Sequence, residues 1–318
     1  MIGQAARRRK AGTEPVVLST RGGLTVTVMP SRGARIGQIT DTLGTNWLAD
    51  TGAGELPDGA PVEFANGSRG GWDECMPSVS GCPDPNRVGA DIADHGDFWA
   101  TPWAVESLDE GAVALTTGRA DHPLQVRKTV SLPAGRESLR VDLEVLNRSG
   151  SPYRFLYSAH PLWAFSNDAM IDVPGASEMS TAFGPGWPQR TAGSWPMAPA
   201  ANSGRQDISR IPYRGDRTNY KVFVRWSGEA RLTVPALGSA VVLRQSPAIT
   251  PWLGICVNRG AYPSTLDGDH WIAIEPTTAP TDSLVTAIES GWERTLEPGR
   301  VVAWTTNIEI VHGVRSRL

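Results

Sequence analysis

Apolar and polar residues alternate with a period of two along most of the chain from about residue 15. The clearest runs cover residues 16–20 and 24–28, then 125–132 and 139–145, with a short turn inside each pair. This period is typical of strands with one buried face, and the short turns predict hairpins. Further strands are predicted over residues 154–159, 220–226, 230–234, 240–244, 252–257, 271–275 and 301–311.

Helical periodicity is almost absent: one short helix is predicted over residues 283–289, with Asp282 as its N-cap. Closely spaced strands without intervening helices are typical of antiparallel sheets packed as a sandwich. Two long stretches, residues 51–97 and 174–212, lack a strand pattern and are predicted to be functional loops. We therefore expect an all-β, single-domain antiparallel β-sandwich over residues 15–318, after a flexible basic tail over residues 1–14.

Composition supports a loop-rich β protein. The 34 glycines and 25 prolines are 59 of 318 residues, which is well above the usual share of about 12%. With 40% hydrophobic and 20% charged residues, the chain can bury a substantial core and is not expected to be disordered. A net charge of −3 provides no electrostatic reason to bind nucleic acid or an anionic membrane.

The cysteines and the N-terminal residues do not indicate a disulfide scaffold or a targeting signal. Cys75, Cys82 and Cys256 are too few for a disulfide scaffold, and their spacing matches no zinc knuckle or redox motif, so we interpret them as reduced thiols. The basic residues 7–10 are not followed by an apolar signal segment. No run approaches the roughly 20 apolar residues of a membrane-spanning helix. A cytoplasmic protein is the expectation.

Two of the five histidines lie where a catalytic site is plausible. His160 follows an apolar strand and precedes a proline, which predicts a position at a sheet rim, and His95 lies in a Gly-containing loop. The alternative for His160 is a core histidine hydrogen-bonded to the backbone. His122 and His312 are predicted to be surface residues.

Glu275 is the most unusual carboxylate, because it follows the apolar run Trp271-Ile272-Ala273-Ile274. A glutamate at the end of a buried strand has a raised pKa unless it is paired, which suits a general base near neutral pH. A structural carboxylate bound by loop amides is the alternative.

Tryptophans concentrate in the predicted loops. An indole face can stack on a sugar ring while its N–H binds a hydroxyl, although most tryptophans pack in cores. The chain has no nucleophile elbow, no phosphate-binding glycine loop and no zinc helix motif. Asp94, His95 and Asp97 are a weakly supported metal group.

Five segments in order resemble the aldose 1-epimerase (galactose mutarotase-like) family, and they extend over nearly the whole chain. They are Gly33-Ala34-Arg35-Ile36, Gly70-Gly71-Trp72-Asp73-Glu74-Cys75-Met76-Pro77, Asp94-His95-Gly96-Asp97-Phe98-Trp99, Ala159-His160-Pro161-Leu162-Trp163 and Ile274-Glu275-Pro276-Thr277-Thr278. The resemblance implies a large β-sandwich with an open carbohydrate cleft. It also implies that Glu275 is the general base, His160 the general acid and His95 a second histidine that steers the sugar, without a cofactor or metal.

The resemblance also implies residues that hold the sugar, and these are less clearly placed. The two residues after the His-Pro pair depart from the family pattern: they are Leu162 and Trp163, where an aromatic residue and Asn are typical. The expected aspartate is assigned to Asp216, with Asp267 and Asp269 as competitors. Arg35, Arg69 and Arg217 could meet an anionic sugar or be solvated surface residues. The substrate-binding candidates are therefore His95, Arg35, Trp72, Asp73, Trp99, Trp163 and Asp216.

Three functions remain open on these residues. The first is a cofactor-independent sugar mutarotase acting on a free or anionic aldose. The second is a non-catalytic carbohydrate-binding or sensing protein, which would not need both Glu275 and His160. The third is another reaction in the same cleft, such as a lyase, which would need a stronger or metal-assisted base. In all three the partner is a small monosaccharide.

Overall fold

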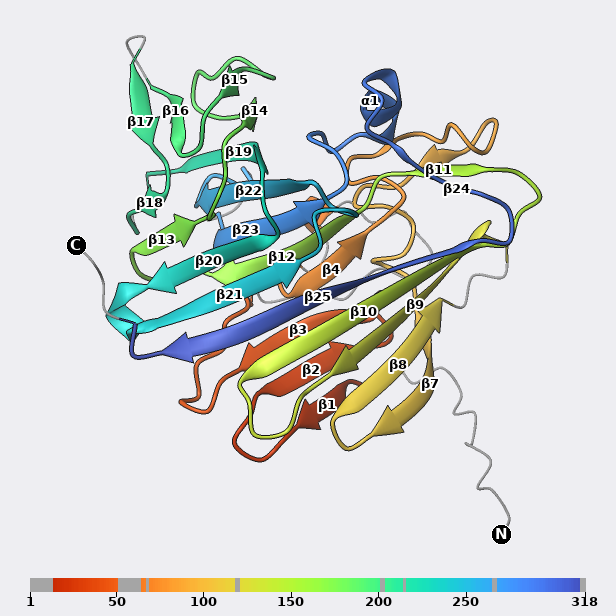
Figure 1. Ribbon diagram of the computed structural model, residues 1–318, viewed down its shortest axis with the longest axis horizontal. Helices are drawn as coiled ribbons and strands as arrows, with labels where there is room; N and C mark the ends of the chain where they lie inside the picture. The colour runs from red at the N-terminus through yellow and green to blue at the C-terminus, as the bar shows by residue number, and fades with distance from the viewer. Residues whose placement is uncertain are drawn as a thin grey trace.

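The computed structural model describes residues 14–50, 64–66, 69–117, 121–200, 204–213, 216–264 and 268–314. Two large antiparallel sheets stack face to face, with the nine-stranded sheet nearer the viewer in Figure 1. The predicted all-β sandwich is therefore confirmed. Residues 1–13 of the predicted basic tail lie outside the described residues.

The ten-stranded sheet carries most of the chemistry predicted from the sequence. Its spatial order is β1 (Val16–Ser19), β2 (Thr25–Met29), β3 (Arg35–Thr40), β4 (Trp72–Cys75), β12 (Ser158–Ala164), β23 (His270–Thr277), β22 (Trp252–Arg259), β19 (Thr218–Arg225), β14 (Met179–Phe183) and β15 (Ala192–Gly193).

The nine-stranded sheet covers one face of the first. Its order is β18 (Arg210–Ile211), β13 (Ala169–Asp172), β20 (Glu229–Val234), β21 (Ser239–Gln245), β25 (Val301–His312), β10 (Ser138–Asn147), β9 (Leu124–Ser131), β8 (Ala112–Thr117) and β7 (Trp103–Asp109). Two-stranded ribbons pair β5 (Cys82–Pro83) with β6 (Asp91–Ile92), β11 (Tyr153–Phe155) with β24 (Arg294–Leu296), and β16 (Met197–Pro199) with β17 (Arg205–Asp207).

The main core lies between the two sheets, and the period-two pattern explains it. In β9 and β10 every second residue is buried, so that one face of each strand contributes to the core and the other faces solvent. The two strands pair as the predicted hairpin, and β1 pairs with β2 in the same way.

The central strands of the ten-stranded sheet are buried on both faces. β12, β22 and β23 consist almost entirely of buried residues. Their inner faces join the main core, whereas Leu162, Trp271 and Ala273 on the outer face form a second apolar cluster with Phe64 and Trp99. Phe64 belongs to a short 3₁₀ helix, η1 (Phe64–Asn66), so a described part of the 51–97 stretch covers this outer face.

The two stretches predicted as loops contain strands. Residues 51–97 include the central strand β4, and residues 174–212 include β14 to β18. Apart from β14, these strands are only two or three residues long or, like β4, buried throughout, and neither kind shows a period of two. The strands that carry His160 and Glu275 also run past Pro161 and Pro276, which pair with Trp72 and Leu253. Both residues therefore lie inside strands. The sheet-rim position predicted for His160 is wrong.

The predicted helix is present as α1 (Leu284–Glu289), but its N-cap is Ser283, which accepts a hydrogen bond from Thr286 N. Asp282 does not cap the helix, because its carboxylate binds Lys221. A second 3₁₀ helix, η3 (Pro235–Leu237), links β20 to β21. None of the helices in the described ranges is long and apolar enough to cross a membrane.

Candidate active site

Cross-strand pairing aligns Arg35, Asp73, His160, Glu275 and Gly254 in one row across five neighbouring strands. His160 pairs with Asp73, and Gly254 pairs with Glu275. The β12–β23 pairs on either side place His160 opposite Glu275, and the Ile36–Trp72 pair places Arg35 opposite Asp73. Directly opposed residues share a face of the sheet. The row therefore puts residues that are up to 240 positions apart in sequence side by side on the outer face.

His160 and Glu275 form the centre of this row. His160 Nε2 lies 3.6 Å from Glu275 Oε1, and the two side chains are only 6% and 1% exposed. That distance is longer than a hydrogen bond. Within the described part of the chain, His160 Nδ1 and Glu275 Oε1 have no hydrogen-bond partner. Buried polar atoms are usually hydrogen-bonded, so two unbonded atoms on neighbouring side chains distinguish this pair from an ordinary structural one.

Lys221 on β19 occupies the other oxygen of Glu275. Its Nζ donates to Glu275 Oε2 (2.6 Å) and to Asp282 Oδ1 (2.8 Å). Gly254 allows this approach, because a Cβ at that position would lie 2.9 Å from Glu275 Oε2 and 3.4 Å from Lys221 Cε. Sequence reasoning missed Lys221. The available signal was a lysine in the otherwise apolar run Tyr220-Lys221-Val222-Phe223-Val224.

Burial shifts the pKa values of both Glu275 and His160. It raises the pKa of Glu275 above its ordinary value of 4.5, although the neighbouring Lys221 opposes the shift. Burial, followed by electrostatic interactions with His95, Lys221 and Arg35, lowers the pKa of His160 well below 6.5. The free protein therefore holds His160 as a neutral imidazole near pH 7. The predicted raised pKa of Glu275 agrees with this environment even though the carboxylate is paired.

His95 reaches the same place from a loop. Its backbone is left-handed (φ 62°), which is uncommon for a residue with a side chain and is often found at functional sites. Gly96 follows with φ 86°, and a Cβ there would lie 2.1 Å from Met76 O, so only glycine fits. The His95 ring stacks on Phe64 at 4.0 Å between ring centroids and lies 4.9 Å from His160. Its Nδ1 is 3.1 Å from Asp94 Oδ1.

A cavity of about 300 Å³ opens over this group. A cavity of this size fits a small ligand, and it combines aromatic walls with a few polar groups, as small-molecule sites do. Its lining residues are Phe64, Val79, Ser80, Asp94, His95, His160, Phe183, Asn219, Lys221, Cys256, Tyr262, Trp271, Glu275 and Asp282. The structure thus brings together three predicted residues, His95, His160 and Glu275.

Known structures share this architecture. No protein-family model matches the chain, and no curated protein has a significantly similar sequence. Among solved structures, the Slr1438 protein of Synechocystis aligns with a TM-score of 0.69 and 15% identity over 98% of this chain and 99% of that one. A galactose mutarotase-like protein of Lactobacillus casei aligns with a TM-score of 0.66 and 17% identity, over 94% and 100%. A galactose mutarotase related enzyme of Lactobacillus acidophilus aligns at 0.64 and 14%, over 95% and 99%.

The chain has the galactose mutarotase-like fold. The resemblance inferred from five short sequence segments is therefore confirmed in three dimensions. At such low identity the likeness establishes the fold alone, and the activity has to be argued from the site.

Two tryptophans predicted to bind the sugar lie elsewhere in this mutarotase-like fold. Trp72 and Trp163 are fully buried in the main core. Trp72 is one position from the row residue Asp73, and Trp163 is three positions from His160. Because both spacings are odd, strand alternation points these side chains toward the other sheet. Trp99 is also buried, beneath Phe64 and His95, and its Nε1 donates to Asp94 O. The aromatic residues that line the cavity are instead Phe64, Phe183, Tyr262 and Trp271.

The predicted charged sugar contacts are also partnered away from the cavity. Arg35 donates twice to Asp73 at 2.8 and 2.7 Å, in a pair that is almost completely buried. Asp216 lies 3.1 Å from Arg259, and Asp269 binds Arg69 at 2.6 Å. None of these residues lines the cavity, and Asp267 lies outside the described residues. The carboxylates that do line it are Asp94, Glu275 and Asp282.

Asp97 has partners outside the expected metal group Asp94–His95–Asp97. Asp97 binds Arg87 (2.7 Å) and His122 Nε2 (3.1 Å). His122 is therefore a buried residue, contrary to the predicted surface position, because its imidazole joins this ion group. His312 is partly exposed and lies 2.7 Å from Glu137.

The described residues do contain one group that could hold a metal ion. Ligand atoms of Cys75, His95 and His160 all lie within 4.8 Å of one another. A thiol with two imidazoles suits zinc and similar soft cations. Burial, together with the carboxylates of Asp73 and Glu275, raises the pKa of the Cys75 thiol well above its usual value.

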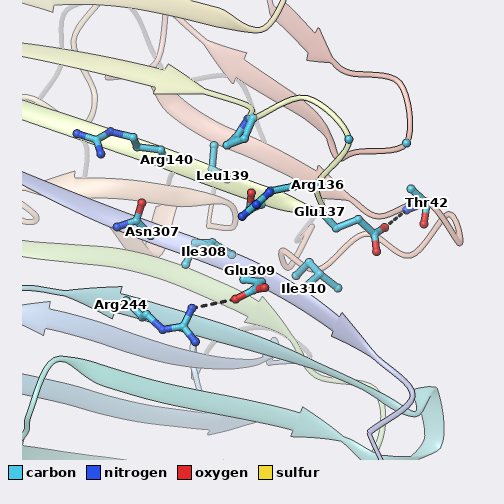
Figure 2. Close-up of a pocket in the computed structure, with 14 residues that line it drawn as sticks. Thr42, Arg136, Glu137, Leu139, Arg140, Arg244, Asn307, Ile308, Glu309 and Ile310 are labelled. Atoms are coloured by element: carbon cyan, nitrogen blue, oxygen red, sulfur yellow. Dashed lines mark hydrogen bonds and ion pairs between the residues drawn. The ribbon is translucent and has the colours of Figure 1, made fainter.

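A larger hollow of about 680 Å³ lies on the nine-stranded sheet, around β10 and β25 (Figure 2). Several of its charged side chains already have protein partners: Arg244 donates to Glu309 at 2.9 Å, and Glu137 accepts from Thr42 N at 2.6 Å. Arg140 is paired with Asp142 in the same way. This hollow lacks a titratable group with a free functional atom comparable to Glu275 Oε1, so the cavity at His160 is the better candidate.

Proposed function

We propose that this protein is a cofactor-independent sugar mutarotase, which interconverts the α and β anomers of a free aldose. The observation that carries the proposal is the His160–Glu275 pair: the two side chains lie 3.6 Å apart, each has a polar atom without a hydrogen-bond partner among the described residues, and both residues line a cavity of sugar size. Ring opening of a cyclic hemiacetal requires an acid at the ring oxygen and a base at the anomeric hydroxyl. These two oxygens are bonded to the same carbon, so a closely spaced acid and base can reach both.

The reaction requires only proton transfers by these residues. Glu275 removes the proton from the anomeric hydroxyl while His160, as the imidazolium, donates a proton to the ring oxygen, and the C1–O5 bond breaks. The open-chain aldehyde then turns about its C1–C2 bond and presents its other face. Ring closure returns one proton from Glu275 and takes one back to His160, so that both groups regain their starting state. Each such group contributes about 10²–10⁴-fold to the rate.

The surroundings support the same roles. Lys221 binds Oε2 of Glu275 and leaves Oε1 toward His160, so it orients the base. His95 lies beside His160 and is placed to hold a sugar hydroxyl. The only lysine or arginine among the described lining residues is Lys221, which is already bound by two carboxylates. This charge balance favours a neutral aldose over a phosphorylated or sulfonated one.

Exchange NMR of anomer interconversion tests the proposal. Glucose, galactose, a 6-phosphosugar and a 6-sulfonated sugar are measured with the wild-type protein and with His160→Gln. We expect faster interconversion of a neutral sugar and a loss of about 10²–10⁴-fold in the variant. Sugar binding seen as line broadening without any acceleration would contradict the mutarotase and support a sugar-binding protein.

A further inference from the structure

Cys75 lies close to His95 and His160 but does not line the cavity, and it has no part in the proposed sugar chemistry. It ends β4, and its side chain is on the same face of the sheet as that of His160, two residues along from the row residue Asp73. The thiol is fully buried. Three separate segments therefore converge on one point: β4 with Cys75, β12 with His160, and the loop that carries His95.

The donor atoms of these three residues fit a soft divalent cation. Cysteine sulfur and histidine nitrogen are the usual ligands of zinc, with bonds of about 2.3 Å to sulfur and 2.0–2.1 Å to nitrogen. Tetrahedral geometry with those bonds puts neighbouring donors about 3.5 Å apart. The observed upper limit of 4.8 Å is close enough for side-chain rotation to bring them onto one ion.

Two further observations favour a cation here. His160 Nδ1 is buried without a hydrogen-bond partner among the described residues, although buried imidazole nitrogens are normally bonded. The cavity lined by His95 and His160 provides a path for an ion from solvent.

We propose that Cys75, His95 and His160 form a binding site for Zn²⁺ and that the bound ion inhibits the enzyme. Binding forms a sulfur–metal bond and releases the thiol proton to solvent. The imidazole of His160 then bonds to the metal and is not free to protonate a sugar ring oxygen. The inhibition rests on the proposed mutarotase function, whereas the metal site does not.

Co²⁺ is the spectroscopic probe for the site, because a thiolate ligand produces a charge-transfer band in the near ultraviolet. Chelator-treated full-length protein is titrated with Co²⁺, followed by competition with Zn²⁺. We expect the band in the wild type, its loss in Cys75→Ser, and a more than tenfold weaker affinity in His95→Asn, since even residues that only support ligands cost about 10–100-fold. Cys256→Ser is the matched control, because Cys256 is a buried thiol of the same cavity outside the cluster.

The outcomes separate the two parts of the proposal. A wild type without the band, or a band lost in Cys256→Ser and kept in folded Cys75→Ser, overturns the site; circular dichroism establishes that each variant is folded. Inhibition is measured as each variant's rate with Zn²⁺ divided by its own rate without it. We expect wild-type inhibition that chelator reverses and Cys75→Ser lacks. Full activity at saturating Zn²⁺ overturns inhibition. A cobalt band in a protein without mutarotase activity refutes the proposed function and leaves the site supported.

Discussion

Two buried Lys–Glu pairs on opposite faces of the same sheet have different surroundings. On the inner face, Lys128 Nζ lies 2.9 Å from Glu74 Oε1, and Tyr157 donates to the other oxygen at 2.7 Å. On the outer face, Lys221 binds Glu275 at 2.6 Å, but Oε1 of that glutamate has no hydrogen-bond partner in the described parts. Burial raises the pKa of both glutamates.

The different surroundings of the two glutamates separate a structural carboxylate from a candidate catalytic one. Both oxygens of Glu74 have a close neighbour, Lys128 Nζ at 2.9 Å and the Tyr157 hydroxyl at 2.7 Å. The ion pair links β4 of one sheet to β9 of the other, so Glu74 belongs to the architecture. Glu275 has a close partner on one oxygen, its other oxygen lies 3.6 Å from His160 Nε2, and the residue lines a cavity. A carboxylate that is half satisfied by the protein retains one oxygen for a substrate.

The largest effect should follow from Glu275→Gln. The amide keeps the size of the side chain but cannot accept the anomeric proton, so the mutarotation rate per folded molecule should fall by about 10²–10⁴-fold. Exchange NMR with a neutral aldose measures it. A variant with more than half of the wild-type rate would remove Glu275 from the role of base.

Glu74→Gln should instead reduce stability. It leaves Lys128 as a buried charge without its carboxylate, and breaking a buried pair costs about 3–5 kcal/mol. Denaturant unfolding should show the loss, while the rate per folded molecule stays within about threefold of the wild type, since a tenfold change would correspond to 1.4 kcal/mol at the site. Unchanged unfolding of this variant would contradict the structural role.

Lys221→Met tests how the outer pair is tuned. Removing the positive charge raises the pKa of Glu275 further, because Lys221 is the main group that lowers it. The acid limb of the rate profile should therefore move to higher pH, with a smaller loss at the optimum than in Glu275→Gln. If kcat/KM is recorded against pH and the acid limb stays in place, Lys221 does not tune the base.

The smallest expected effect is the dependence of the wild-type rate on pH, and its direction is fixed by the two pKa shifts. The base form of Glu275 exists above a pKa that is raised from 4.5, with Lys221, Asp282 and His95 facing it. The acid form of His160 exists below a pKa lowered from 6.5 by burial, His95, Lys221 and Arg35. The kcat/KM maximum in chelator-containing buffer should therefore lie below pH 6.5 and fall as pH rises through neutrality. An optimum above pH 7 would exclude His160 as the acid.

The candidate site was partly predictable from the sequence. A histidine and a glutamate at the ends of apolar runs, and a histidine in a Gly-containing loop, were identified as His160, Glu275 and His95, and they do meet at one cavity. Lys221 was missed because a single lysine in a strand usually points to solvent. Trp72 and Trp163 were misplaced because their strands are buried on both faces, so the pattern does not show which face is inward.

The sequence by itself determined the strands with one solvent-exposed face, the hairpins between them and the all-β class, because alternation and turn residues are local properties. Only the tertiary structure decided that Asp73, His160 and Glu275 are opposite one another, since register between distant strands depends on how both sheets pack. It also decided that one buried Lys–Glu pair closes on a tyrosine while the other faces a cavity. Adjacent residues of a strand point to opposite faces, and only packing determines which of those faces a ligand can reach.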